Sequence, residues 1–254
     1  MDLRMQGTVV LITGGGRGIG RASALAFGAE DVSVIVADID LAVAESVAQE
    51  VVAKGGRATA VFMDVASESS VEEGIAAGVA VFGRLDHLVL CAGVSGLLGQ
   101  PFDEIEASAW DDVFAVNVKG QWLPVKYGAK YLRASDQGSV AIIASDSSIV
   151  ASPLHVPYCT SKGALLMLVR ALAVDLRRDN IRVNCVCPSV VNTRMPKIDT
   201  GMAESDSFDG SFPVHEASDI ANYLVWLSSP VTHTISGHAL VADFGFSGES
   251  SFPM

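Results

Sequence analysis

Apolar residues occur in short runs that alternate with amphipathic stretches along the whole chain. Seven runs are nearly continuously apolar, which is typical of strands buried on both faces of a sheet. These runs lie at residues 8–12, 32–38, 57–64, 85–93, 138–145, 181–188 and 238–243. Because helical stretches separate them, the strands are expected to pair in parallel, with helices on both faces. The pattern predicts an α/β fold with a doubly wound parallel sheet of about seven strands, in a single domain spanning residues 1–254.

The stretches between the strands carry signals of their own. Residues 40–56 form an amphipathic pattern that ends in two glycines, a C-terminal stop signal for a helix. Within residues 108–133, Pro124 cannot donate a hydrogen bond to the carbonyl of Gly120, which predicts a kink. The one irregular segment, about residues 194–215, is polar and long for a loop, and we expect it to border the substrate.

The composition of the chain limits the kinds of partner that the protein can bind. The chain has 254 residues, of which 50% are hydrophobic and 18% charged, so it can bury a sizeable core. A net charge of -12 argues against nucleic-acid binding, which needs clustered Lys and Arg. No stretch reaches the roughly 20 apolar residues that cross a bilayer, and the N-terminus lacks the pattern of a signal peptide. We therefore expect a small-molecule partner, no nucleic acid and no membrane.

The four cysteines are Cys91, Cys159, Cys185 and Cys187. Their spacing matches neither a disulfide framework nor a zinc site, so we expect reduced, structural thiols and no metal. Cys185 and Cys187 stand in an apolar run, and we expect one of them to point into the core. Reduced cysteines are typical of a cytoplasmic protein.

A glycine-rich turn follows the first strand and opens the first helix. Residues 13–20 read "TGGGRGIG", and glycines let a backbone turn tightly while a helix N-terminus presents free amides to a pyrophosphate. Asp38 ends the second strand, where a carboxylate accepts hydrogen bonds from the adenosine ribose and repels a 2′-phosphate. This order predicts NAD rather than NADP. Arg17 in the turn could assist a 2′-phosphate, and we favour a place along the pyrophosphate.

Tyr158 and Lys162 stand four residues apart at the start of a helical stretch, on one helix face. A free phenol has a pKa near ~10, and a neighbouring ammonium favours the phenolate. Alone, such a pair could be a solvated helix edge. Next to a nucleotide-binding pattern, it predicts a proton-transfer pair.

The chain resembles the classical short-chain dehydrogenase/reductase family from Thr8 to about Gly248. The motifs that carry the resemblance occur in the family's order and at its spacing. They are the glycine turn at Thr13–Gly20, "LCAG" at Leu90–Gly93, Asn117 in "AVNVKG", Ser145, Tyr158 with Lys162, and "PSVVNT" at Pro188–Thr193. The resemblance implies a Rossmann-type fold and an oxidoreductase.

The resemblance also implies a catalytic set of Asn117, Ser145, Tyr158 and Lys162. Tyr158 would act as general acid and base, and Ser145 would hold the substrate oxygen. Asn117 would hold a water that links Lys162 to solvent, and Lys162 would bind the nicotinamide ribose. Two alternatives stay open at this point: Asn117 as a buried amide that satisfies backbone groups, and Ser145 as a turn or cap residue.

Further contacts come from the turn, from the strand ends and from the helix of Tyr158. The expected cofactor contacts are Gly14, Gly16, Arg17, Gly18, Ile19, Gly20, Asp38, Asp64, Val65, Cys91, Ala92, Gly93, Tyr158, Lys162, Pro188, Val191 and Thr193. The expected substrate contacts are Ser145, Ser147, His155, Tyr158, Ser189 and Val190. For His155 we favour a place in the substrate wall over a second acid/base role.

Two positions depart from the family pattern. Cys91 replaces an asparagine, and since a thiol donates weakly, some local stabilisation is expected to be absent. Ser189 replaces a glycine beside the nicotinamide and adds bulk at the substrate edge. Neither change touches the reacting groups.

These features predict an NAD-dependent oxidoreductase that interconverts a secondary alcohol and a ketone. The segments "SIVASPLHVP" and "SVV" are largely apolar, which indicates an apolar cyclic or steroid-like substrate. The alternatives are an NADP-dependent 3-oxoacyl thioester reductase and a non-catalytic NAD-binding protein. The resemblance also suggests a homotetramer that pairs through residues 108–133 and 157–178, with the C-terminal tail either docked on a neighbouring subunit or frayed.

Overall fold

Seven parallel strands form one sheet in the computed structural model, which describes residues 2–203, 205–208 and 210–248. The sheet order is β3-β2-β1-β4-β5-β6-β7, and every pair of neighbours is parallel. The strands are β1 (Val9–Thr13), β2 (Ser33–Asp38), β3 (Arg57–Phe62), β4 (His87–Leu90), β5 (Ser139–Ile143), β6 (Arg182–Pro188) and β7 (Ala239–Ala242). The predicted α/β class and the doubly wound parallel sheet are confirmed.

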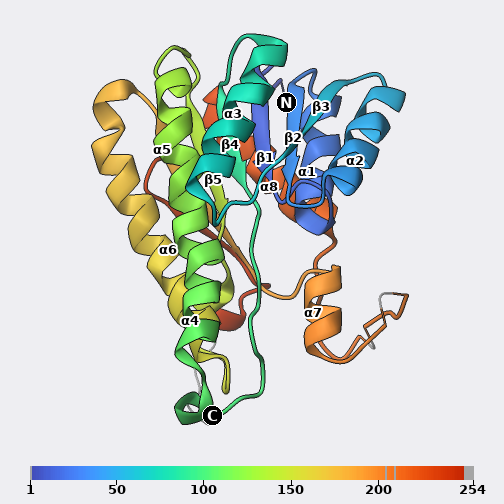
Figure 1. Cartoon of the computed structure of the whole chain (residues 1–254), viewed down its shortest axis with the longest axis vertical. Coiled ribbons are helices and arrows are strands. Elements are labelled where there is room, and N and C mark those ends of the chain that lie inside the picture. Colours follow the sequence, from blue (N-terminus) through green and yellow to red (C-terminus); the bar gives the residue numbers. More distant parts are fainter. Residues whose placement is uncertain (1, 204, 209, 249–254) are drawn as a thin grey trace.

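Helices cover both faces of this sheet (Figure 1). They are α1 (Gly18–Ala29), α2 (Leu41–Ala53), α3 (Glu68–Phe82), α4 (Ala107–Phe114), α5 (Gly120–Leu132), α6 (Val156–Asp175), α7 (Arg194–Asp199) and α8 (Ala217–Ser228). Helices α3, α5 and α6 pack on one face around Leu88 and Val140, and α1, α2 and α8 pack on the other around Val34 and Val89. Because both faces are covered, the strands need the continuous apolar runs seen in the sequence.

The strand order determines where a ligand can bind. From β1 the chain builds β2 and β3 on one side and then returns to build β4 on the other side of β1. Helices leave in opposite directions at such a switch point, so a crevice forms at the carboxyl ends of the strands. Thr13, Asp38, Leu90, Ile143 and Pro188 end their strands at this same edge.

The long helical region predicted at 108–133 is interrupted, but not at Pro124. A π-helical segment, Ala115–Lys119, separates α4 from α5, and α5 continues through Pro124. Segments of π-helix are frequent at functional sites because they displace a side chain from the regular helical positions. Asn117 lies in the middle of this segment and is fully buried.

The segment predicted as a loop at 194–215 begins with the short helix α7, which the polar composition did not reveal. A β-bridge joins His215, at the end of the segment, to Val191, which lies just before its start. Both Cys185 and Cys187 are buried in the core rather than one of them, because alternate residues of a strand share a face. All four cysteines are free. None of the helices in the described ranges is long and apolar enough to span a bilayer.

Candidate active site

The glycine turn between β1 and α1 fits closely around its own backbone. Gly14 has a φ of +59°, and a Cβ on it would lie 2.8 Å from the α-carbon of Ala92. A Cβ on Gly20 would lie 2.0 Å from the carbonyl oxygen of Gly14, a separation that no side chain tolerates. The turn therefore leads directly into α1, whose first amide groups have no partners within the helix and suit a pyrophosphate.

The carboxylate of Asp38 is bonded to this turn. Its Oδ2 accepts a hydrogen bond from the amide of Gly16 at 2.9 Å, and its Oδ1 accepts one from the amide of Asp40 at 3.0 Å. A Cβ on Gly16 would approach Asp38 Oδ2 to 2.9 Å, so a larger residue would fill this position. Arg17 forms an exposed ion pair with Asp40, with 3.5 Å between Nη2 and Oδ2. The carboxylate of Asp38 thus borders the turn, and the guanidinium of Arg17 is already paired with Asp40.

Further expected contacts follow β3 and β4, which stand on opposite sides of β1 in the sheet. Asp64 Oδ1 accepts a hydrogen bond from the amide of Ala66 at 2.9 Å, and Val65 is buried. A Cβ on Gly93 would lie 3.4 Å from Asn117 Oδ1 and 3.7 Å from Lys162 Nζ. The segment after β4 therefore joins the nucleotide turn to the expected catalytic residues.

Cys91 begins this segment as a half-buried side chain. Burial raises the pKa of its thiol to about 12, although a hydrogen bond with Ser23 opposes the change. Its backbone amide still donates to the carbonyl of Thr13 at 3.1 Å. Cys91 is therefore a neutral thiol. The backbone bond links the end of β4 to β1, although a cysteine replaces the asparagine of the family pattern.

The Asn117 side chain is fully engaged by its neighbours. Its Oδ1 accepts from the amide of Val94 at 2.9 Å, while its Nδ2 donates to the carbonyl of Val94 at 2.8 Å and to Ser161 Oγ at 3.0 Å. These bonds satisfy backbone groups, as the buried-amide role requires, and the role of Asn117 in holding a water that links Lys162 to solvent stays a prediction. Asn117 connects the π-helical segment to the end of β4 and to α6.

Tyr158 and Lys162 lie together at the start of α6, with Nζ 5.6 Å from the centroid of the phenol ring. Lys162 is 4% exposed and donates a hydrogen bond to the carbonyl of Ile143 at 3.0 Å. That carbonyl belongs to the last residue of β5, so the ammonium is fixed beneath the strand end that leads to Ser145.

Burial dominates the electrostatics of this pair. It lowers the pKa of Lys162 to about 8. It also raises the pKa of Tyr158 to about 12; a hydrogen bond with Ser145 opposes this change, while the carboxylates of Asp146 and Asp199 add to it. The protein's own groups thus raise the pKa of Tyr158, chiefly because burial disfavours the charged phenolate. The lowered pKa expected beside Lys162 and a bound dinucleotide stays a prediction.

Ser145 lies after β5 and caps a short 3₁₀ turn at Asp146–Ser148. Its Oγ donates to Asp146 Oδ1 at 2.9 Å and accepts from the amide of Ser147 at 3.1 Å. The side chain is 6% exposed. Ser145 therefore serves as a turn residue and also faces Tyr158, so the two interpretations are compatible.

The segment at Pro188–Thr193 closes the crevice from the β6 side. A Cβ on Gly18 would lie 3.1 Å from Thr193 Cγ2, so this segment reaches the glycine turn. Within the part of the chain that the structure describes, the buried hydroxyl of Ser189 has no hydrogen-bond partner. A buried hydroxyl without a partner is costly unless a ligand supplies one. The tight glycine turn, the fixed acid and this hydroxyl together fit a dinucleotide.

The His155 ring is largely buried, and its place in the substrate wall stays a prediction. It is 8% exposed and its ring stacks on Tyr158, with centroids 4.5 Å apart and planes 7° apart. Its Nε2 lies 3.2 Å from the carbonyl oxygen of Ser95. The Ser95 hydroxyl in turn donates to Asp199 Oδ1 on α7 at 2.7 Å. Neither Ser95 nor Asp199 was expected from the sequence, since no motif marks them.

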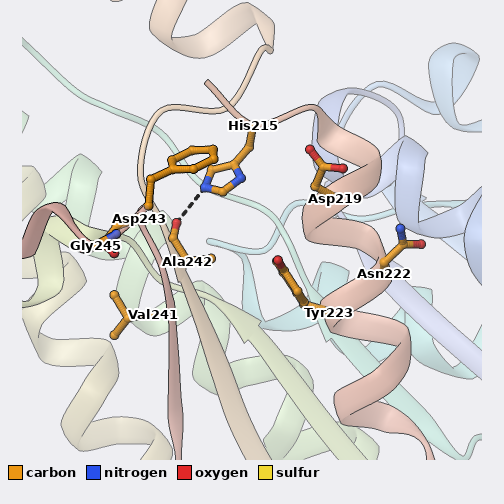
Figure 2. A pocket seen from close by; sticks show the side chains of 9 residues that line it. His215, Asp219, Asn222, Tyr223, Val241, Ala242, Asp243 and Gly245 are labelled. Atoms are coloured by element: carbon orange, nitrogen blue, oxygen red, sulfur yellow. Dashed lines mark hydrogen bonds between the residues drawn. The ribbon is translucent and has the colours of Figure 1, made fainter. Parts of the chain in front are cut away.

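A separate cavity of about 460 Å³ lies between α8 and the end of β7 (Figure 2). Tyr223, Asn222 and Asp219 line it from α8, and His215 donates from Nε2 to the carbonyl of Ala242 at 2.8 Å. His215 also stacks on Phe244, with centroids 4.1 Å apart. None of the expected site residues lines this cavity.

Comparison with known proteins gives matches over nearly the whole chain. Residues 14–247 match a family model described as enoyl-(acyl carrier protein) reductase. Secoisolariciresinol dehydrogenase of Forsythia intermedia is 32% identical over 96% of this chain and 90% of its own length. The mitochondrial borneol dehydrogenase of Lavandula x intermedia is 32% identical over 96% of this chain and 92% of its own.

A solved structure agrees with these sequence matches. A dehydrogenase/reductase from Sinorhizobium meliloti 1021 superposes with a TM-score of 0.86 at 30% identity, covering 96% of both chains. Fold, site geometry and relatives agree: the chain belongs to the short-chain dehydrogenase/reductase family of oxidoreductases, which use NAD or NADP.

Proposed function

We propose that this protein is an NAD-dependent dehydrogenase that interconverts a secondary alcohol and a ketone. The observation that carries the proposal is the convergence of Tyr158, Ser145 and Lys162 beside a glycine turn that is bonded to Asp38. A phenol, a hydroxyl and an amine at one strand edge suit proton transfer to or from an oxygen atom. When bound, NAD would accept a hydride from the alcohol carbon, and its positive charge would favour the phenolate.

In this proposal Tyr158 takes the hydroxyl proton of the alcohol and returns it to the ketone oxygen in the reverse direction. Ser145 donates a hydrogen bond to the same oxygen, after turning its hydroxyl away from Asp146. Lys162 has three N–H donors, of which Ile143 takes one, so the others can bind ribose hydroxyls and accompany the proton transfer. The engaged amide of Asn117 fixes the backbone at Val94 and the hydroxyl of Ser161, and Asn117 would hold a water that links Lys162 to solvent.

The choice of NAD rests on Asp38. Its carboxylate borders the turn where the adenosine ribose would bind, and like charges in contact cost several kcal/mol. We expect the wild type to prefer NAD over NADP by at least about 100-fold in kcat/KM, and Asp38→Ser to lose most of that preference. Absorbance of the reduced nicotinamide with each cofactor measures both. Glu45→Gln, on the exposed face of α2, is the matched control, and a wild type that prefers NADP would contradict the proposal.

Apolar side chains around the site support an apolar substrate. The carboxyl-edge loops and α7 expose large hydrophobic residues that the core does not use. They are Val94, Leu97, Leu98, Ile149, Val150, Leu154 and Ile198. A group of exposed apolar residues beside a site is typical of a wall that binds an apolar ligand.

A panel of secondary alcohols tests the substrate class. We expect kcat/KM to rise about tenfold or more from small aliphatic alcohols to bulky cyclic ones, because each buried methylene contributes roughly 0.8 kcal/mol. Reduction of NAD followed by absorbance provides the measurement. Activity confined to small, charged hydroxy acids would reject an apolar substrate.

Two alternatives lead to different results in the same assays. A 3-oxoacyl thioester reductase would oxidise NADPH with a thioester substrate, and Asp38 argues against it. A non-catalytic NAD-binding protein would bind NAD and turn over no alcohol. A pure binder has no need of the buried Lys162 beside Tyr158, and burying an amine is costly.

The oligomeric state of the protein is part of the same proposal. We expect a homotetramer in which residues 108–133 and 157–178 pair between subunits. Exposed Met167, at 61%, and Val174, at 65%, lie on α6 and support an apolar contact there. Phe244 and Phe246, each 54% exposed, support docking of the described part of the C-terminal tail on a neighbouring subunit; residues 249–254 lie outside the described residues.

Three measurements test the remaining expectations. Light scattering in solution should give four times the mass of one chain. Limited proteolysis should leave the chain as a single resistant unit, as a single domain requires. Cell fractionation should find the protein in the cytoplasm, as its reduced cysteines suggest.

A further inference from the structure

The ring of His155 restricts the catalytic phenol. The two rings are nearly parallel, and such a stack prevents Tyr158 from swinging toward His155. His155 is itself fixed, because its Nε2 donates to the carbonyl of Ser95. The orientation of Tyr158 therefore depends on where the backbone at Ser95 lies.

Ser95 belongs to a segment that is attached at several points. The amide and carbonyl of Val94 are bonded to Asn117 at 2.9 and 2.8 Å, and the amide of Gly99 donates to the carbonyl of Leu154 at 3.0 Å. Between these points, the Ser95 hydroxyl donates to Asp199 at 2.7 Å. The segment 94–99 thus connects α7, the π-helical segment and the loop that precedes α6.

Helix α7 belongs to the cofactor and substrate side of the molecule. It is preceded by Thr193, which lies against the glycine turn, and its Ile198 is 55% exposed. Figure 1 shows α7 set apart from the helices that cover the sheet. Its contact with Ser95 therefore joins the ligand-facing helix to the residues that hold Tyr158.

We propose that Ser95 is a positioning residue that couples the docking of α7, through Asp199, to the orientation of Tyr158, through His155. The inference rests on the proposed function, in which Tyr158 is the acid and base. A carboxylate that accepts from a hydroxyl at 2.7 Å makes a strong, charge-assisted contact. A substrate that orders α7 would thereby also fix the phenol in its reacting position, and this favours substrates large enough to touch α7.

The charged and titratable groups around the phenol make the coupling measurable. Lys162 and Cys159 face Tyr158 from α6, Asp146 faces it from the 3₁₀ turn, and Asp199 faces it from α7; His155 stacks on it. Asp199 contributes to the raised pKa of Tyr158. Releasing α7 removes this carboxylate, so the pKa of Tyr158 should fall.

The test compares Ser95→Ala with two changes at its partner. We expect Ser95→Ala and Asp199→Ala each to lower kcat about tenfold, and the double variant to be no slower than either alone, because one contact is lost in all three. Asp199→Asn retains an acceptor for the Ser95 hydroxyl and should keep most of the activity. Ser95→Thr keeps a hydroxyl donor and should also keep most of the activity, and Ser69→Ala, at an exposed serine on α3, is the matched control.

Absorbance of phenolate gives a readout that does not depend on turnover. The Tyr158 signal is the difference between each protein and the same protein carrying Tyr158→Phe. We expect its midpoint to move to lower pH in Ser95→Ala. Additive effects of the two alanine changes, or an unchanged kcat together with an unchanged midpoint, would overturn the coupling. A wild type that turns over no alcohol would instead overturn the proposed function, while the titration would still test the coupling.

Discussion

Replacing Tyr158 by phenylalanine is expected to lower kcat for alcohol oxidation by about 10³-fold and to leave the affinity for NAD within about twofold. The change removes one oxygen atom from a stacked ring and keeps the ring's contact with His155. General acid-base catalysis contributes roughly 10² to 10⁴ in rate, so most of the activity should disappear. The loss should appear in kcat and kcat/KM alike, because the proton transfer occurs only in the transition state.

The matched control is Tyr127→Phe, on α5. Its hydroxyl donates to Glu68 on α3 at 2.8 Å, and this exposed bond involves none of the expected catalytic residues. That variant should keep the wild-type rate, since only an exposed hydrogen bond is lost. Quenching of tryptophan fluorescence by NAD measures affinity in both variants. Turnover by Tyr158→Phe at a rate close to the wild type would remove Tyr158 from the mechanism.

The sheet could be predicted from the sequence because each strand carries its own signal. Residues 181–188, for example, form an apolar run between turn residues, and β6 occupies Arg182–Pro188. The break in the helical region could be placed only approximately. Pro124 is visible in the sequence, whereas the π-helical segment at Ala115–Lys119 arises from the packing of Asn117 against Val94 and Ser161. Such tertiary contacts leave no periodic pattern.

The proximity of site residues could be predicted from the sequence where one helix or strand carries both residues. Tyr158 and Lys162 share a helix, so their spacing alone brings them together. Ser95, on the loop after β4, and Asp199, on α7, are 104 positions apart and meet only in the folded protein. The burial that raises the pKa of Tyr158 could not be predicted for a similar reason, since spacing shows the neighbouring amine but not how deeply the phenol is buried. The lowering expected beside a bound dinucleotide stays a prediction.

A second polar network lies at the opposite edge of the sheet, where β4 begins. His87 is fully buried, with Nδ1 2.8 Å from Ser139 Oγ and Nε2 3.2 Å from Thr8 Oγ1. Burial lowers its pKa to about 4; the neighbouring Asp86 opposes this change, and the positive charge of Arg182 adds to it. The folded protein therefore keeps His87 neutral at a pH where an unfolded chain binds a proton.

This difference predicts a loss of stability in mild acid. Above pH 6.5 His87 is neutral in both states and has no effect, but from about pH 6.5 down to about 4 only the unfolded chain takes up the proton. The free energy of unfolding should fall by about 1.4 kcal/mol per pH unit, or about 3 kcal/mol over the interval. Asp86 affects stability at lower pH. Burial raises the pKa of its carboxyl, but the bonds to Arg84, Ser135 and Val9 outweigh burial and lower it. The stability that the Asp86 carboxylate contributes is therefore lost only below about pH 4.

Urea unfolding at several pH values between 7.5 and 4, followed by tryptophan fluorescence, measures this slope. His87→Gln offers an amide to Ser139 and Thr8 but cannot titrate, so its stability should depend much less on pH in the same interval, whatever its stability at pH 7.5. His233→Gln changes an exposed histidine outside the network and should keep the wild-type slope. If His87→Gln and the wild type lose stability in parallel, the acid sensitivity arises elsewhere, and the buried imidazole is then neutral in the unfolded chain as well or protonated in both states.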